Sequence, residues 1–411
     1  MAVPKREPVL ADYKIITTFT GVKQIFLFLT VLLFPVTATA QIREEYRPLA
    51  DMLATLPERE PTEGNLVELL SEGPYVFEKL QEDILAAEET IHAEYFIFNA
   101  DYEGNTIRTA MRLKALDGLE VRYIAEDFST NGAFIDNMKK SGVEVKHHAL
   151  TPLRCRNHQK LLLLDRKVGY TGGLNIAHDN FYDWEDITVR LRGPIVAKME
   201  QLYAKMWERH LGKPSAYDIP EIQPYEGGVI AQSVDDNPET KAHLNLKAYI
   251  WALEHAKDYF FAKTPYFKPP QELADALADA ARRGVDVRLI IPWEKDPVAV
   301  IEVPFERVFY EDLVKAGVHI YMRTDMFDHS KMFVMDDYLS CTGSINLDAL
   351  SLLYNFENNV YFYDEGTALQ IKSIIEDDFD KCFQLTMEHI NAFPFWQKRF
   401  KNALRILGKV F

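Results

Sequence analysis

Two stretches of the chain place histidine, lysine and asparagine side chains at identical spacings. Each reads H-x-K, then an aspartate five residues after the lysine, a glycine seven residues further on and an asparagine three residues after that. The matched residues are His158, Lys160, Asp165, Gly172 and Asn175 in the first stretch and His329, Lys331, Asp336, Gly343 and Asn346 in the second. With the same offset of 171, Asp186 and Glu357 extend the register. This agreement indicates an internal duplication.

These side chains are suited to the transfer of a phosphoryl group. Ammonium and amide groups stabilise the negative charge that a phosphate gathers in a transition state. Two imidazoles can act as nucleophile and general acid, one neutral and one protonated. Asp186 and Glu357 are candidates to hold an imidazole in the reactive tautomer. If the two sets meet in one cavity, they predict a phosphoryl-transfer site that needs no metal or other cofactor.

Other motif residues are predicted to shape the backbone. Asp165 and Asp336 end their strands at turns, where an acid that caps the backbone is favoured over a catalytic one. Small residues after the next strand let the chain bend and return each asparagine toward its histidine. These structural positions are Gly172, Gly173, Gly343 and Ser344.

The elements around the motifs repeat as well. In a strand, residues i and i+2 share a face, which places each histidine and its lysine together at the mouth of an apolar strand. In each half an amphipathic helix (76–87; 244–256) precedes an apolar strand (90–98; 259–263), and further helices and strands alternate. This rhythm predicts a sheet covered on both faces. We expect an α/β protein of two duplicated α/β/α sandwich domains, packed about a pseudo-twofold axis.

Composition changes suggest the domain boundaries. The segment 212–228 is rich in proline and glycine and is the predicted linker. We expect an N-terminal extension at 41–65, a first domain at 66–211, a second at 229–392 and a C-terminal helix at 393–411. The formal charge of −16, with 62 acidic against 46 basic residues, makes nucleic acid an unfavoured partner.

Both ends of the chain carry signals for a membrane. Lys14 and Lys23 precede an apolar run at 25–34, which is followed by Pro35 and by Ala38-x-Ala40. Residues 1–40 are therefore predicted to be a secretory signal peptide or a retained anchor. We therefore expect the protein to be exported and associated with the outer (periplasmic) face of the inner membrane.

The C-terminal helix is basic and amphipathic. One interpretation is docking at an anionic membrane surface; the other is packing of its apolar face on the second domain. The candidate membrane contacts are Trp396, Lys398, Arg399, Phe400, Lys401 and Arg405.

The repeated motif resembles the paired HKD motifs of the phospholipase D superfamily, and both copies match in full. Nearly everything after about residue 66 is similar to bacterial cardiolipin synthases. The stretches that carry this resemblance are HAEYFIF, RNHQK, GGLNIA, WEDITVRLRGP, KTPYFKPP, RRGVDVRLIIP, AGVHIY, FDHSK, GSINLDALS and NFENN. The resemblance implies a phospholipase D-like fold and the conversion of two phosphatidylglycerol molecules to cardiolipin and glycerol through a phosphatidyl-histidine.

The resemblance also implies roles for single residues. His158 would be the nucleophile and His329 the acid and base, although the near-symmetry of the sequence does not decide between them. Four side chains would bind the phosphate: Lys160, Lys331, Asn175 and Asn346. Asp186 and Glu357 would orient the histidines. A phospholipase D-type hydrolase or head-group exchange enzyme is the alternative, followed by a nuclease. The chain departs from the family in having one short N-terminal apolar run where two membrane helices are common.

Overall fold

The computed structural model describes residues 41–127, 129–148, 155–211, 219–293, 303–401 and 403–404. The expected signal peptide or anchor at 1–40 lies outside the described residues, as do Arg405, the side chain of Lys398 and residues 212–218 of the expected linker. Within the described ranges, no helix combines the length and apolar character needed to cross a bilayer. The interpretation of residues 1–40 therefore stays a prediction.

The described strands form one large mixed sheet and two short ladders. The large sheet contains β1 (Thr62–Leu70), β2 (Thr90–Tyr95), β3 (Glu120–Glu126), β4 (Glu144–His148), β5 (Lys160–Leu164), β6 (Val168–Gly172), β8 (Thr188–Arg192), β9 (Val229–Asp236), β10 (Tyr259–Lys263), β12 (Asp286–Pro292), β13 (His319–Arg323), β15 (Met332–Met335), β16 (Leu339–Gly343), β18 (Glu357–Tyr363) and β19 (Cys382–Gln384). The short ladders pair β7 (Trp184–Glu185) with β14 (Phe327–Asp328), and β11 (Phe267–Lys268) with β17 (Leu347–Asp348).

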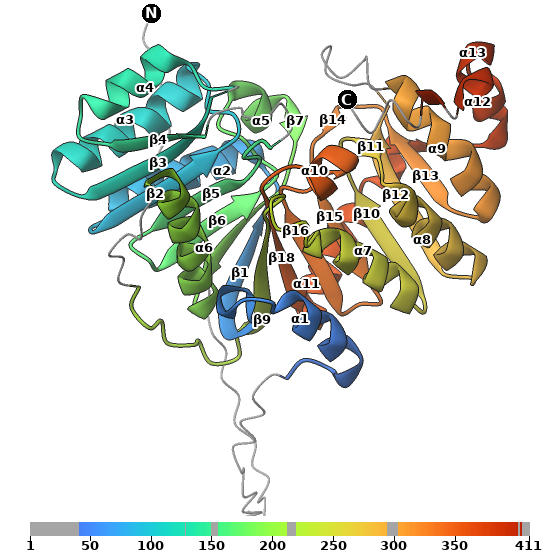
Figure 1. The fold of residues 1–411 in the computed structure, drawn as a ribbon, viewed down its shortest axis with the longest axis horizontal. Helices are drawn as coiled ribbons and strands as arrows, with labels where there is room; N and C mark the ends of the chain where they lie inside the picture. Colours follow the sequence, from blue (N-terminus) through green and yellow to red (C-terminus); the bar gives the residue numbers. More distant parts are fainter. Residues whose placement is uncertain are drawn as a thin grey trace, which may run out of the picture. The chain divides into compact units, whose positions relative to one another are not determined.

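The strand order displays the duplication. It runs β19-β13-β12-β10-β15-β16-β18-β9-β1-β8-β6-β5-β2-β3-β4, so the second half of the list mirrors the first once β19 is set aside. The antiparallel pair of β1 and β9 stands at the centre and joins the halves edge to edge (Figure 1). The predicted duplicated α/β fold is thus confirmed, and its two sheets are continuous.

Helices cover the sheet on both faces. They are α1 (Arg47–Leu53), α2 (Gly73–Ala86), α3 (Tyr102–Leu116), α4 (Gly132–Lys139), α5 (His178–Tyr182), α6 (Pro194–Leu211), α7 (Leu244–His255), α8 (Gln271–Arg282), α9 (Val303–Ala316), α10 (Ala349–Leu353), α11 (Glu365–Glu376), α12 (Met387–Asn391) and α13 (Phe395–Arg399). Helices α2, α4, α5 and α6 each start 171 residues before their counterparts α7, α9, α10 and α11. Helix α3 starts 169 residues before α8. The duplication therefore includes the helices.

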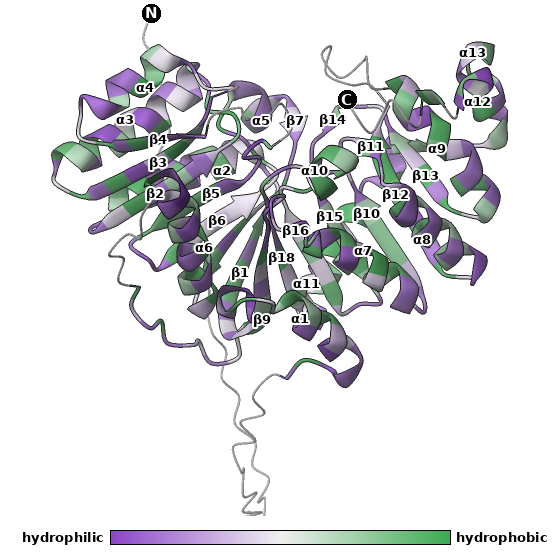
Figure 2. Cartoon of the chain, viewed as in Figure 1, coloured by the Kyte–Doolittle hydropathy of each residue, from purple (hydrophilic) through white to green (hydrophobic). Residues whose placement is uncertain are grey.

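The apolar core consists of three clusters. One lies under α2–α5 in the first half and one under α7–α9 in the second, while the third joins α6 and α11 to strands of both halves. In that third cluster, Val189 and Tyr203 belong with Val360 and Ile371. In Figure 2 hydrophobic residues lie along the central strands, and the outer helices carry hydrophobic and hydrophilic residues in alternation. Because burial of apolar surface drives folding, the junction of the halves is part of the fold itself.

The N-terminal extension packs on the second half. Leu49 and Leu53 of α1 belong to the same core cluster as Leu253 of α7. Strand β1 begins at Thr62 and so runs across the expected start of the first domain at residue 66.

Helix α13 packs on α9 through its polar side. Lys401 Nζ donates to Asp312 Oδ1 of α9 (2.7 Å), and Gln397 is buried. The aromatic side chains face outward, since Trp396 is 47% exposed and Phe400 is 56% exposed. Leu404, on the apolar face of the same stretch, packs against the core cluster of the second half. Docking at a membrane and packing on the second domain therefore both stay predictions. Lys401 is engaged with α9.

Candidate active site

Each motif histidine contacts the carboxylate of the opposite half. His158 Nδ1 lies 2.9 Å from both carboxylate oxygens of Glu357, and His329 Nδ1 lies 2.6 Å from Asp186 Oδ2. All four side chains are buried. A carboxylate that accepts from Nδ1–H leaves the Nε2 lone pair available for chemistry. The crossed contacts bring both copies of the motif into one site.

The backbone repeats this crossed arrangement. His158 N–H donates to Phe356 O (2.9 Å), and His329 N–H donates to Glu185 O (2.7 Å). Each acceptor immediately precedes the carboxylate that holds the same histidine. The residues bridged in parallel are Asn157 with Phe356 and Asp328 with Glu185. Ring and backbone of each histidine are therefore fixed by one short segment of the other half.

The two motif lysines are buried beside the histidines. Lys160 Nζ donates to His158 O (2.6 Å), and Lys331 Nζ donates to His329 O. Their positive charges act across the site, because Lys331 contributes to lowering the pKa of His158 and Lys160 to lowering that of His329, after the larger effect of burial. Two ammonium groups thus act on both imidazoles, as a phosphate-binding arrangement requires.

The two asparagines are also buried. Asn175 Oδ1 accepts from Ile97 N–H (3.2 Å), which directs the amide oxygen to the backbone and leaves its N–H groups to bind a ligand. Asn346 Oδ1 has no hydrogen-bond partner within the described part of the chain. A buried amide with unused bonding capacity is expected where a polar ligand binds.

The two carboxylates are supported differently. Ser344 Oγ donates to Glu357 Oε2 (2.5 Å), and Asn355 Nδ2 donates to Glu357 Oε1 (3.4 Å). The position equivalent to Ser344 in the first half is Gly173, where a Cβ atom would lie 2.1 Å from Asp186 Oδ1. The shorter acid thus packs against bare backbone, and the longer acid is held by a hydroxyl.

Burial and neighbouring charges shift the titration of the site. Burial, together with Lys331, lowers the pKa of His329 well below its usual value, and burial lowers the pKa of His158 although Glu357 opposes this. Burial also lowers the pKa of Lys331 to about 8 and raises the pKa of Asp186 to about 7. Burial alone would raise the pKa of Glu357, but His158 holds it below its usual value. At neutral pH the imidazoles are therefore mainly neutral, as a nucleophile requires.

The motif aspartates lie at the other end of their strands. Asp165 accepts hydrogen bonds from the backbone N–H groups of Glu88, Glu89 and Thr90. Asp336 accepts from those of Lys257, Asp258 and Tyr259. Both aspartates adopt a positive φ, and each ties the turn after its strand to the start of a neighbouring strand. At the site end, Gly172 has a φ of 150°, and a Cβ there would lie 2.3 Å from Ile187 O.

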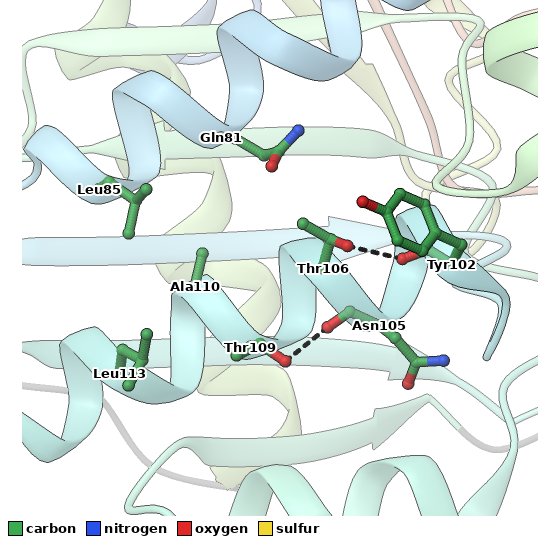
Figure 3. A pocket seen from close by; sticks show the side chains of 8 residues that line it. All are labelled: Gln81, Leu85, Tyr102, Asn105, Thr106, Thr109, Ala110 and Leu113. Atoms are coloured by element: carbon green, nitrogen blue, oxygen red, sulfur yellow. Dashed lines mark hydrogen bonds between the residues drawn. The ribbon is translucent and has the colours of Figure 1, made fainter.

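A cavity of about 420 Å³ lies between α2 and α3 (Figure 3). Its lining contains none of the predicted site residues: Gln81, Leu85, Tyr102, Asn105, Thr106, Thr109, Ala110 and Leu113. The hydroxyls of Thr106 and Thr109 donate to the carbonyls of their own helix. The cavity offers no reactive group, so the side-chain cluster alone defines the candidate active site.

Aromatic side chains beside the histidines were not singled out from the sequence. The Phe96 ring lies 4.8 Å from the His158 ring, and the Trp184 ring lies 5.4 Å from the His329 ring, between centroids. A signal was present for both, because Phe96 recurs in the second half as Phe267 and Trp184 lies two residues before Asp186. The position equivalent to Trp184 in the second half is Asn355, so the repeat did not identify Trp184 as a site residue.

A duplicated α/β fold that joins two H-x-K motifs in one buried site defines a protein of the phospholipase D superfamily. The family model described as "Cardiolipin synthase, PLD-like domain" matches the chain twice, at residues 80–207 and 249–382. The chain therefore belongs to this family.

Curated relatives and solved structures agree with this assignment. Cardiolipin synthase 1 of Staphylococcus epidermidis (strain ATCC 35984) is 30% identical over 379 residues, 88% of this chain and 77% of the relative. The major cardiolipin synthase ClsA of Bacillus subtilis is 29% identical over 368 residues, 85% of this chain and 76% of the relative. The crystal structure of phosphatidylserine synthase from Haemophilus influenzae has the same fold, with a TM-score of 0.67, 13% identity, and coverage of 89% of this chain and 99% of that one.

Proposed function

We propose that this enzyme transfers a phosphatidyl group from one phosphatidylglycerol molecule to another, which forms cardiolipin and releases glycerol. The observation that carries the proposal is the pair of buried histidines, each held at Nδ1 by a carboxylate of the other half and each followed by a buried lysine. The similarity to cardiolipin synthases supports the choice of lipid and of transfer over hydrolysis.

The first step forms a covalent intermediate. Following the family resemblance, His158 Nε2 attacks phosphorus, the bond from phosphorus to the glycerol oxygen breaks, and His329 gives a proton to the departing glycerol. The low pKa of free His329 opposes this protonation, and the negative charge of the bound phosphate favours it. Lys160 and Lys331 stabilise the charge on the phosphoryl oxygens, aided by the two motif asparagines.

The second step reverses the first with a new alcohol. His329, now neutral, accepts the proton from a glycerol hydroxyl of the second phosphatidylglycerol. The oxygen of that hydroxyl attacks phosphorus, and the bond from phosphorus to His158 Nε2 breaks. The product is cardiolipin, and both imidazoles return to their initial states.

The product of this reaction tests the proposal directly. Purified enzyme incubated with phosphatidylglycerol vesicles, without nucleotide and with a metal chelator, is expected to form cardiolipin and glycerol in equal amounts. Lipids are quantified by mass spectrometry and glycerol by an enzymatic assay. Phosphatidic acid with glycerol and no cardiolipin would instead identify a hydrolase.

We also propose that α13 contacts an anionic membrane surface. Its polar side is attached to α9, whereas Phe395 (79% exposed), Trp396 and Phe400 face outward beside the exposed Arg399. Aromatic rings with a basic neighbour are the side chains that enter the interface of an anionic bilayer. This contact would hold the enzyme at the surface where its lipid substrate is found.

Replacing the three exposed aromatic residues tests this contact. The variant Phe395→Ser/Trp396→Ser/Phe400→Ser is expected to bind phosphatidylglycerol vesicles at least about tenfold more weakly, because buried aromatic rings contribute roughly 1.5–3 kcal/mol each. Vesicle sedimentation measures the binding. Tyr102→Ser on α3 is the matched control, since Tyr102 is 74% exposed. Equal binding by the triple variant and the wild type would refute the contact.

A further inference from the structure

The two crossed bridges differ in the charges that they carry. Beside His158 the bridged residues are Asn157 and Phe356, and neither is charged. Beside His329 they are Asp328 and Glu185, two acids held next to each other across the halves. Like charges opposite each other on paired strands destabilise the pairing. The bridge at His329 therefore requires positive charge nearby.

Two buried cations supply that charge. Lys263 Nζ, at the end of β10, lies 2.7 Å from Glu185 Oε1 and 2.8 Å from Asp328 Oδ2. Arg323 Nη2, at the end of β13, lies 2.7 Å from Glu185 Oε2. Both cationic side chains have no exposed surface, and both also contact Asp378, which is itself buried. The cations thus bind an acid of the first half to acids of the second.

The acids of this cluster lie close enough together to bind a metal ion, but the two cations occupy the space between them. Ligand oxygens of Glu185, Asp328 and Asp378 lie within 4.8 Å of one another. Lys263 and Arg323, together with Lys381 Nζ at 2.9 Å from Asp378 Oδ1, already supply three positive charges to these three acids. Burial alone would lower the pKa of Lys263, but Asp328 and Glu185 raise it above its usual value, so the ammonium stays charged. The cluster is an ion-pair network between the halves.

In the described part of the first half, other residues stand at the positions equivalent to Lys263 and Asp328. The position that corresponds to Lys263 in the repeat is His92, which contacts Glu200 Oε2 (2.9 Å) and Glu120 Oε1 (3.0 Å). Asn157, in the place of Asp328, donates from its Nδ2 to Glu94 Oε2 (2.9 Å). The bridge at His329 is thus held by paired charges across the halves, whereas the bridged residues beside His158 are uncharged.

We infer that Lys263 and Arg323 are positioning residues for the histidine–carboxylate pair of His329 and Asp186. The carbonyl of Glu185 accepts from His329 N–H, and Asp186 is the next residue in the chain. By holding the side chain of Glu185 to that of Asp328, the cations fix the register in which His329 Nδ1 meets Asp186. The consequence for turnover rests on the proposed function, whereas the effect on the imidazole does not.

Two variants test the inference. Lys263→Met removes the one lysine that contacts Glu185, Asp328 and Asp378 together. It is expected to lower kcat about 10- to 100-fold with little change in KM, because small displacements of a catalytic group have effects of this size. In isotope-labelled protein, the His329 Nδ1–H resonance should shift or broaden, and that of His158 should not. The double variant Lys263→Met/Asp328→Asn restores the wild-type net charge of the cluster. Its kcat is expected to be at least about tenfold higher than that of Lys263→Met alone.

Further variants separate positioning from stability. Glu185→Gln keeps both cations and decides the question if Lys263→Met does not fold; it is expected to reduce kcat and to shift the same His329 resonance. His92→Gln breaks buried contacts at the equivalent position and should lower the unfolding temperature without altering kcat. A wild-type kcat and an unchanged His329 resonance in Lys263→Met or Glu185→Gln would overturn the inference. Absence of cardiolipin formation by the wild type would instead refute the proposed function.

Discussion

Replacing either motif histidine by alanine is expected to abolish cardiolipin formation, with kcat at least about a thousandfold lower. The reaction needs one imidazole to bond to phosphorus and another to move a proton, and no neighbouring group can do both. His158→Ala and His329→Ala are each expected to remain folded, because alanine removes the imidazole without adding volume to the site. Product formation and circular dichroism together measure these two effects.

The two variants should differ in one respect. If His158 is the nucleophile, His329→Ala can still form the phosphatidyl-histidine, whereas His158→Ala cannot. Phosphatidylglycerol with a labelled phosphate, followed by denaturation in alkali, would leave label on His329→Ala alone. Label on His158→Ala alone would exchange the two roles. Full turnover by either variant would refute the two-histidine mechanism.

Much of the fold was predictable because the repeat imposes two consistent patterns. The predicted strand 259–263 and helix 244–256 agree with β10 and α7 to within a residue. The strand predicted at 90–98 was too long, since β2 ends at Tyr95. Beyond it, Ile97 N–H donates to Asn175 Oδ1 and Phe98 bridges Ile176, so the chain leaves the ladder to hold the asparagine loop. Apolar periodicity cannot detect this change of partner, because the residues stay buried.

The candidate site was predictable in composition but not in connection. The spacing from His158 to Asp186 is the same as from His329 to Glu357, so sequence allows each acid to serve its own half or the other. Only the packing of the halves decides, and it selects the crossed pairs. Lys263 was also missed, because its counterpart in the repeat is a different residue. A lysine in an otherwise apolar strand was the available signal, since a buried ammonium requires partners.

Because the pairs are crossed, neutralising one acid is expected to disable the histidine of the other half. Asp186→Asn should lower kcat by between about a hundredfold and ten-thousandfold, since an amide can present N–H to Nδ1 and favour the wrong tautomer. Glu357→Gln should act in the same way on His158. Because an acid and its histidine act as one unit, Asp186→Asn combined with His329→Ala should be no slower than His329→Ala alone. Turnover of phosphatidylglycerol measures all three variants.

The spectroscopic result locates each effect. In isotope-labelled protein, Asp186→Asn should displace the Nδ1–H resonance of His329, assigned by its loss in His329→Ala, and leave that of His158 in place. Glu357→Gln should do the reverse. If each substitution instead altered the histidine of its own half, the acids would not be crossed in solution. The crossed outcome would mean that neither repeat can form a working half-site without the other, which gives a physical reason for the register that both copies share.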